Sequence, residues 1–179
     1  MGIIGGITSI FRNTVKRLTV NGFEIYYNLS SKVTCFVIFG YDEIKTPQLL
    51  LYLSDYLSRM PMSIPFVDIW ADSEPHTCVE QSTQKAQLRK NRHLYILPSP
   101  SLMSNAQEEW FDARCTLLGG FPSKQALSAY VSHLHWTPEK ALRRGHLSAY
   151  LCGDETDGYS FGVRGRDDEL MNGLVSLLR

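Results

Sequence analysis

Four acidic side chains follow two strand-like stretches of the chain and could together hold a metal ion. They are Asp42, Glu43, Asp72 and Glu74. The first pair follows the β-branched and aromatic run 33–39, and the second pair follows a similar run, 63–70. If these runs are neighbouring parallel strands, their carboxyl ends meet at the edge where open α/β sheets bind ligands. Carboxylate oxygens suit Mg²⁺, so the spacing predicts a magnesium site there.

A magnesium ion in this position could hold a phosphate group for transfer or hydrolysis. The sequence therefore makes Asp42 and Asp72 candidate catalytic residues of a Mg²⁺-dependent phosphoryl-transfer or hydrolase enzyme. The alternative needs no metal, because carboxylates are equally common in exposed turns and in helix caps. In that case Asp72 or Ser73 simply caps a helix.

Cys78 is a third catalytic candidate, because it lies near an expected helix N-terminus, where the pKa of a thiol is lowered. The preceding residues 67–72, Val-Asp-Ile-Trp-Ala-Asp, resemble the Val-Asp-Phe-Trp-Ala-Glu stretch that leads into the redox site of thioredoxins. The coarse order of strands and helices is also similar to that family. The family's Cys-x-x-Cys is replaced here by residues 73–78, so the resemblance implies a degenerate thioredoxin-like protein without dithiol chemistry.

Other residues that could do chemistry are better explained structurally. His133 and His135, with His146, could be metal ligands, but residues two apart on a helix point to different sides. We therefore expect structural or surface histidines. Asp68 lies inside an expected strand, so it is predicted either to face solvent at an edge or to be buried with a partner.

The elements that would position these residues form a strand–helix–strand unit. Thr46 and Pro47 predict a helix start after the first strand, and Met60–Pro61 predicts its end. Between them, leucines and tyrosines recur at three- and four-residue steps. Two strands joined in this way run parallel, with the helix packed on one face. Residues 93–98 predict a third parallel strand.

The remainder of the chain completes the predicted fold. Asn21–Gly22 predicts an N-terminal β-hairpin. Residues 72–91 predict a solvated helix, and residues 101–152 predict a helical subdomain whose first helix ends at Gly119–Gly120. A late strand and a last helix follow. The prediction is one α/β domain over residues 1–179, with a mixed sheet that combines the hairpin and parallel βαβ strands, plus the C-terminal helical subdomain.

Composition excludes several classes of protein. Of 179 residues, 44% are hydrophobic and 20% are charged, which is typical of an ordinary globular protein. Eighteen basic and eighteen acidic residues cancel, so net charge gives no nucleic-acid signal. No apolar run reaches the ~20 residues of a membrane span. With four widely spaced cysteines and no secretory signal, we expect a cytoplasmic protein.

The opening residues 2–18 predict a short amphipathic helix that could bind another surface. Ile3, Ile7 and Phe11 fall on its apolar side, and its charges are all basic. The basic residues are Arg12, Lys16 and Arg17. Such a helix could lie in a partner's groove, on an anionic membrane surface, or against this protein's own core.

The leading functional hypothesis is a non-catalytic interaction or assembly subunit of a larger complex. The N-terminal helix could dock elsewhere, and aromatic residues, which anchor interfaces, are plentiful near the predicted helical subdomain. These aromatic residues are Trp110, Phe111, Phe121 and Trp136. This hypothesis needs a protein partner and no cofactor, whereas the enzyme hypothesis needs Mg²⁺.

Overall fold

The structure is a computed structural model that describes residues 15–70, 80–104, 115–154 and 158–179. In these ranges nine strands form one sheet, in the order β1-β2-β3-β9-β8-β7-β4-β6-β5. The strands are β1 (Lys16–Val20), β2 (Phe23–Leu29), β3 (Val33–Phe39), β4 (Ile64–Trp70), β5 (Gln84–Arg89), β6 (Arg92–Ile96), β7 (Cys115–Phe121), β8 (Ala149–Asp154) and β9 (Gly158–Arg164). The helices are α2 (Lys45–Arg59), α3 (Lys124–Ser132), α4 (Pro138–Arg143) and α5 (Asp168–Leu178).

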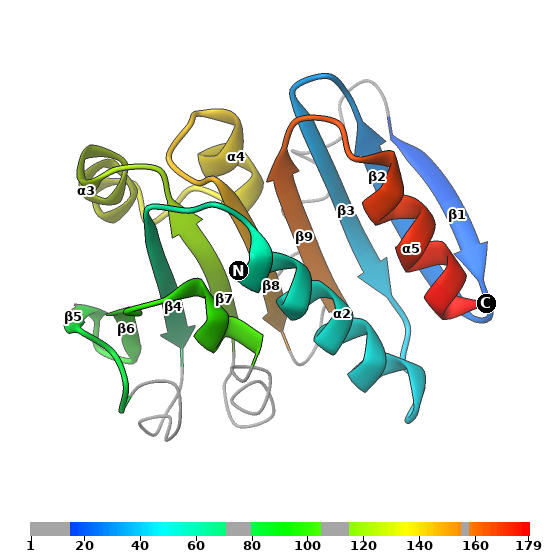
Figure 1. Ribbon diagram of the computed structural model, residues 1–179, viewed down its shortest axis with the longest axis horizontal. Helices are drawn as coiled ribbons and strands as arrows, with labels where there is room; N and C mark the ends of the chain where they lie inside the picture. Colours follow the sequence, from blue (N-terminus) through cyan, green and yellow to red (C-terminus); the bar gives the residue numbers. More distant parts are fainter. Residues whose placement is uncertain (1–14, 71–79, 105–114, 155–157) are drawn as a thin grey trace.

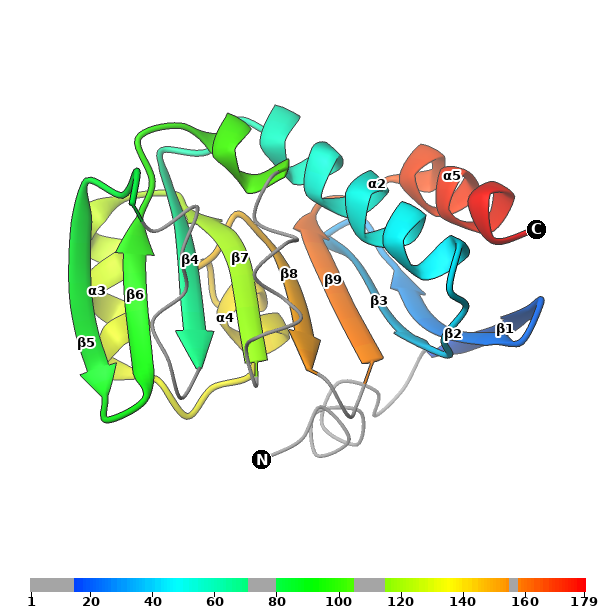
Figure 2. The same ribbon diagram turned by 90° about the horizontal axis from the view of Figure 1, so that it is seen from below.

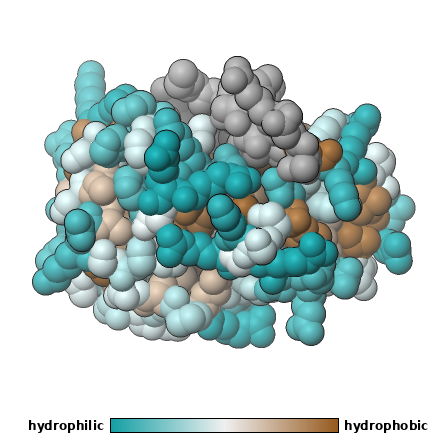
Figure 3. Space-filling model, turned by 90° about the horizontal axis from the view of Figure 1, so that it is seen from above, coloured by the Kyte–Doolittle hydropathy of each residue, from teal (hydrophilic) through white to brown (hydrophobic). Residues whose placement is uncertain are grey.

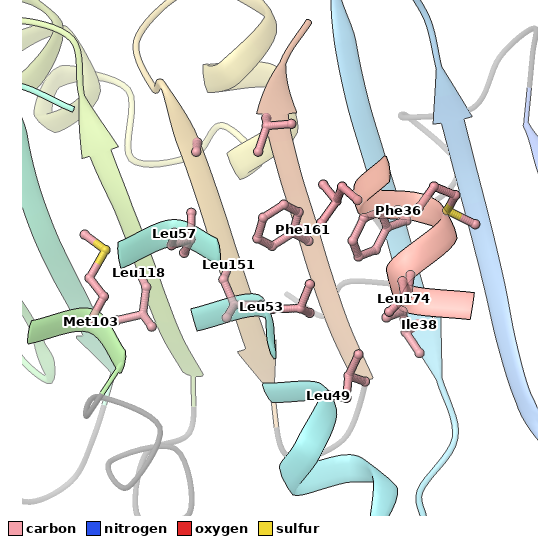
Figure 4. Packing of buried hydrophobic residues seen from close by; sticks show 14 of the residues in the cluster. Phe36, Ile38, Leu49, Leu53, Leu57, Met103, Leu118, Leu151, Phe161 and Leu174 are labelled. Atoms are coloured by element: carbon pink, nitrogen blue, oxygen red, sulfur yellow. The ribbon is translucent and has the colours of Figure 1, made fainter. Parts of the chain in front are cut away.

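Two helices lie on each face of this sheet. α2 and α5 cover one face, and α3 and α4 lie on the other (Figures 1 and 2). Leu49, Leu53 and Leu57 of α2 are fully buried against the sheet. The rings of Phe36 and Phe161, from the neighbouring strands β3 and β9, stack in the same core with centroids 5.2 Å apart (Figure 4).

A second core lies on the opposite face. Phe66 of β4 and Phe121 of β7 stack with ring centroids 4.1 Å apart, and Tyr130 of α3 packs on both. Ala141 and Leu142 of α4 belong to the same cluster. The sheet therefore separates two apolar cores, and its central strands are buried from both sides.

The predicted hairpin turn is confirmed. Asn21 and Gly22 form the turn between β1 and β2, with positive φ angles of 46° and 85°. The turn depends on neighbouring residues alone, so the sequence predicts it well. Capping side chains also begin three helices: Ser123 and Thr137 cap α3 and α4, and Asp167 caps α5 by accepting a hydrogen bond from the backbone N–H of Leu170.

The predicted parallel βαβ unit is wrong. Every neighbouring pair of strands in the sheet is antiparallel. β3 and β4 do point in the same direction, but β9, β8 and β7 lie between them. Four strand spacings separate β3 from β4 by about 19 Å. α2 therefore connects two strands that do not pair with each other. The described strands form one antiparallel sheet in place of the expected parallel βαβ arrangement.

Burial on both faces explains the wrong prediction. Residues 33–38 of β3 are all buried. A continuous apolar run is typical of a parallel strand, because parallel sheets are covered on both faces. Here helices cover both faces of an antiparallel sheet, which gives the same sequence pattern with a different strand order.

Residues 84–96 form an antiparallel hairpin, not the end of a helix followed by a parallel strand. β5 occupies 84–89, where a helix was predicted, and β6 pairs antiparallel with both β5 and β4. β5 is the outermost strand, and nearly all of its residues are exposed. Its polar composition suits an edge strand as well as a solvated helix, because charged side chains discourage further strand pairing.

The predicted helical subdomain over 101–152 is also wrong, because it contains β7 and β8. Gly119 and Gly120 lie inside β7 and end no helix. A Cβ atom at Gly119 would lie 2.7 Å from the carbonyl oxygen of Ala149 and 3.0 Å from the ring of Phe66. Close approach between strands therefore explains this glycine. α4 ends at Arg143, and the chain then enters β8.

The predicted N-terminal helix over 2–18 is contradicted at its end. Lys16, Arg17 and Leu18 lie in β1, where Arg17 pairs with Glu24 of β2 at 2.6 Å. Ile3, Ile7, Phe11 and Arg12 lie outside the described residues.

We predict that Leu53→Ala lowers the free energy of unfolding by about 2–5 kcal/mol, because it leaves a cavity under α2. Leu53 is fully buried, whereas Leu51 on the same helix is 43% exposed. The control Leu51→Ala should change stability by about 0.5 kcal/mol or less. Urea unfolding of both variants measures this, and equal losses would contradict the placement of α2.

Candidate functional site

Asp42 acts as a helix cap in the structure. One of its carboxylate oxygens accepts hydrogen bonds from the backbone N–H groups of Ile44 at 2.9 Å and Lys45 at 2.8 Å. These two bonds lower the pKa of Asp42, with the bond from Lys45 the larger cause. The cap was expected at Thr46, but the side chain of Thr46 instead accepts a hydrogen bond from the backbone N–H of Asp42. These backbone hydrogen bonds explain the Asp42 carboxylate without a metal ion.

The proposed magnesium cluster is not assembled by described residues. Within the described ranges no group of three or more metal-ligating side chains could hold an ion. Asp42 and Glu43 follow β3, but Asp72 and Glu74 lie outside the described residues, as does Cys78. The separation of β3 and β4 by three strands removes the reason for expecting the two pairs to meet.

The loop that enters α2 is tightly held. The backbone N–H of Thr46 donates to the carbonyl oxygen of Asp42 at 3.0 Å, in addition to the side-chain bonds of both residues. Gly40 has a φ of 123°, and a Cβ atom there would lie 3.0 Å from the carbonyl oxygen of Gly22. Lys45 donates from Nζ to the carbonyl oxygen of Leu178 at 2.7 Å. This loop is therefore fixed to both the β1–β2 turn and the end of α5.

This fixed loop and the first two turns of α2 present an exposed apolar stripe, the α2 ridge, consisting of Tyr41, Ile44, Pro47 and Leu51. Tyr41 is 73% exposed, Ile44 71% and Leu51 43%. Steps of three and four residues place Ile44, Pro47 and Leu51 on one side of the helix. In the described part of the chain, only one other large hydrophobic residue, Val131, is comparably exposed.

Sequence analysis missed the α2 ridge, although a signal for it was present. The three- and four-residue steps that predict this helix place Leu49, Leu50 and Leu53 on one side, and these residues are buried. Leu51 lies off that side, which indicates an apolar residue directed away from the core. Ile44 and Tyr41 belong to the loop, where periodicity carries no information.

A cleft lies at the other end of the helix layer, between α5 and the β1–β2 hairpin. Its volume is about 400 Å³, and its apolar lining includes Leu18, Leu29, Met171 and Val175. Apolar surface is visible at this end of the molecule, at the right of Figure 3.

Asp68 is buried with a partner, which is one of the two predicted alternatives. Arg92 of β6 forms a forked ion pair with it, with nitrogen–oxygen distances of 2.9 Å and 2.6 Å. The hydroxyl of Tyr130 donates to the same carboxylate at 2.7 Å, and the ring of Trp70 lies 4.8 Å from the Arg92 guanidinium. Burial and the neighbouring Asp68 raise the pKa of Tyr130 well above its usual value. These contacts join β4, β6 and α3. Asp68, Arg92 and Tyr130 therefore have a structural role.

The three histidines gather around Trp136. The ring of His146 stacks on Trp136 at 5.0 Å, and His133 lies 5.9 Å from His146. Burial lowers the pKa of His146, and the nearby His133 and Arg144 lower it further. His135 lies 6.2 Å from His133 in the same cluster. Despite this proximity, the described histidines make no metal-binding group.

Cys35 is a poorly reactive thiol. Cys35 and Cys152 are both buried, and neither forms a disulfide. Burial, with the charge of Glu139 as a smaller cause, raises the pKa of Cys35 to about 12. Because the thiolate is the reactive form, a thiol with so high a pKa is a poor nucleophile.

Comparisons with known proteins gave no family. No protein-family model matches the chain, and searches of curated proteins and of solved structures gave no match. None of the described helices combines the length and the apolar character that crossing a membrane requires.

We predict that Asp68→Ala lowers the free energy of unfolding by about 3–5 kcal/mol, because it leaves the Arg92 guanidinium buried and unpaired. The matched control is Glu24→Ala, which breaks the exposed Arg17–Glu24 pair and should cost much less. Denaturant unfolding of both variants tests this. Similar losses of unfolding free energy in the two variants would contradict the larger effect expected for the buried ion pair.

We predict that His146 makes stability depend on pH. Its lowered pKa means that the folded protein binds this proton less readily than the unfolded chain, in which the histidine titrates near pH 6.5. The free energy of unfolding should therefore fall as pH decreases through about 6.5. His146→Gln should show a shallower fall between pH 7.5 and 5.5 in thermal unfolding. An equal slope in both proteins would contradict this role.

Proposed function

We propose that this chain is a non-catalytic subunit of a protein assembly and that it docks on its partner through the α2 ridge. One observation carries the proposal: exposed large hydrophobic side chains concentrate between Tyr41 and Leu51. Single exposed apolar residues are ordinary on protein surfaces, but a group of them on one surface is typical of an interaction site.

The way the ridge is held supports a docking role. Asp42 and Thr46 fix the entry loop through hydrogen bonds, and buried leucines hold α2 on the sheet. A surface that is ordered before binding loses little conformational entropy when a partner arrives. Tyr41 is also the residue type that interfaces favour, since a tyrosine ring contributes a large contact area with few rotatable bonds.

The edges of the sheet are less suited to this role. β5 is an exposed edge strand, but its side chains are mostly polar and charged. β1, at the other edge, begins with Lys16 and Arg17. Charged side chains on an edge strand oppose the addition of another strand. The side of α2 that faces away from the sheet is therefore the better docking surface.

We predict that the double variant Ile44→Asp, Leu51→Asp releases the chain from its complex. In lysate of the cells that make it, the unaltered protein should elute well above the 20.3 kDa of one chain. Truncating a central interface residue costs about 2 kcal/mol or more, so the variant should bind roughly thirtyfold more weakly. Size-exclusion chromatography with light scattering of the purified protein, and immunoblotting of lysate fractions, measure this.

The matched control is Val131→Asp, because Val131 is 39% exposed and lies on α3, on the opposite face of the sheet. It should leave the elution position unchanged. Thermal unfolding should confirm that both variants remain folded. Elution of the unaltered protein as a single chain, or release by the control alone, would contradict the proposal.

A further inference from the structure

Resting on the proposed docking function, we propose that the partner presents a basic segment to the α2 ridge. A lysine or arginine of that segment lies over the ring of Tyr41 and pairs with the carboxylate of Glu43. Apolar residues of the same segment pack on Ile44 and Leu51.

The charge around the ridge favours such a partner. Residues 41–51, which carry the ridge, include two acidic residues, Asp42 and Glu43, and one basic residue, Lys45. Farther along α2, the charges of Asp55 and Arg59 cancel. Lys45 donates to the carbonyl oxygen of Leu178 at the end of α5, which directs its charge away from the ridge. Although the whole chain has no net charge, the stretch that carries the ridge therefore has one more acidic than basic residue, and its only basic side chain is directed toward α5.

Glu43 is available to pair with a cation. It is exposed, and it makes no ion pair with any described residue. Asp42 differs, since its carboxylate accepts two backbone hydrogen bonds and belongs to the cap. Glu43 can consequently be replaced without dismantling the loop, which makes it the informative residue for an experiment.

Tyr41 provides a second group that binds cations. Aromatic rings attract ammonium and guanidinium groups that lie over their faces. Within this protein, Arg17 lies over Tyr26 at 5.8 Å and Lys140 over Trp136 at 4.7 Å. Tyr41 has no such cation among the described residues, and its ring is largely exposed. An incoming basic side chain would therefore meet both an open aromatic face and the neighbouring carboxylate of Glu43.

Two probe peptides test the proposal on the full chain. One is the amphipathic 14-mer (Leu-Lys-Lys-Leu-Leu-Lys-Leu)₂, and the other has glutamate in place of every lysine. Titration into ¹⁵N-labelled protein should shift the amide signals of residues 41–55 with the lysine peptide. The glutamate peptide should bind at least about tenfold more weakly. Added salt should weaken binding of the lysine peptide, because exposed charges are screened.

Variants of the ridge separate the two cation contacts. Glu43→Lys should weaken binding of the lysine peptide at least about tenfold, a loss of the size expected for an interfacial charge. The matched control Glu169→Lys reverses an exposed charge on α5 and should leave binding unchanged. Tyr41→Phe should retain binding because the ring remains, whereas Tyr41→Leu should weaken it.

The outcomes that overturn the basic partner differ from those that overturn the docking function. Equal binding of both peptides, binding of neither, or shifts confined to Leu18, Leu29 and Val175 of the cleft would overturn the basic partner. If the Ile44→Asp, Leu51→Asp variant nevertheless leaves its native complex, the docking function stands with a partner of other chemistry. Binding of the lysine peptide that Glu43→Lys does not weaken would also overturn the proposed pairing.

Discussion

Burial of one side of α2 against the sheet is the interaction on which the rest of the structure depends. Leu49, Leu53 and Leu57 are fully buried in one core with Phe161 of β9 and Leu151 of β8 (Figure 4). By crossing from the end of β3 to the start of β4, α2 spans strands that the chain adds only later. α2 thus connects the two halves of the sheet, although β7, β8 and β9, which lie between these halves, come later in the sequence.

The same constraint creates the surface for which we propose a function. A helix on the outer layer can bury only part of its circumference, so its opposite side faces solvent. On α2 that side carries Pro47 and Leu51, and the bonds of Asp42 fix the loop that carries the exposed Tyr41 and Ile44. The side of α2 that stabilises the fold and the side for which we propose recognition are thus opposite each other.

Polar groups have a separate role on the other face of the sheet. Asp68, Arg92 and Tyr130 satisfy one another at the boundary of the second core, so the far half of the sheet is joined to α3 by directional bonds. A buried ion pair adds little net stability but penalises any arrangement that separates its members. This explains a charged residue in the middle of β4 without assigning it chemistry.

The sequence by itself determined the features that neighbouring residues control: the turn at Asn21–Gly22 and the buried side of α2. Only the tertiary structure decided which strands pair. Insertion of β9, β8 and β7 between β3 and β4 separates the strand ends at which a metal site was expected, and no local pattern encodes that insertion. It also decided that the loop residues Tyr41 and Ile44 are exposed, because exposure in a loop depends on what packs around a side chain. Which strands pair depends on the burial of side chains from the whole molecule, whereas a turn depends on a few neighbouring residues.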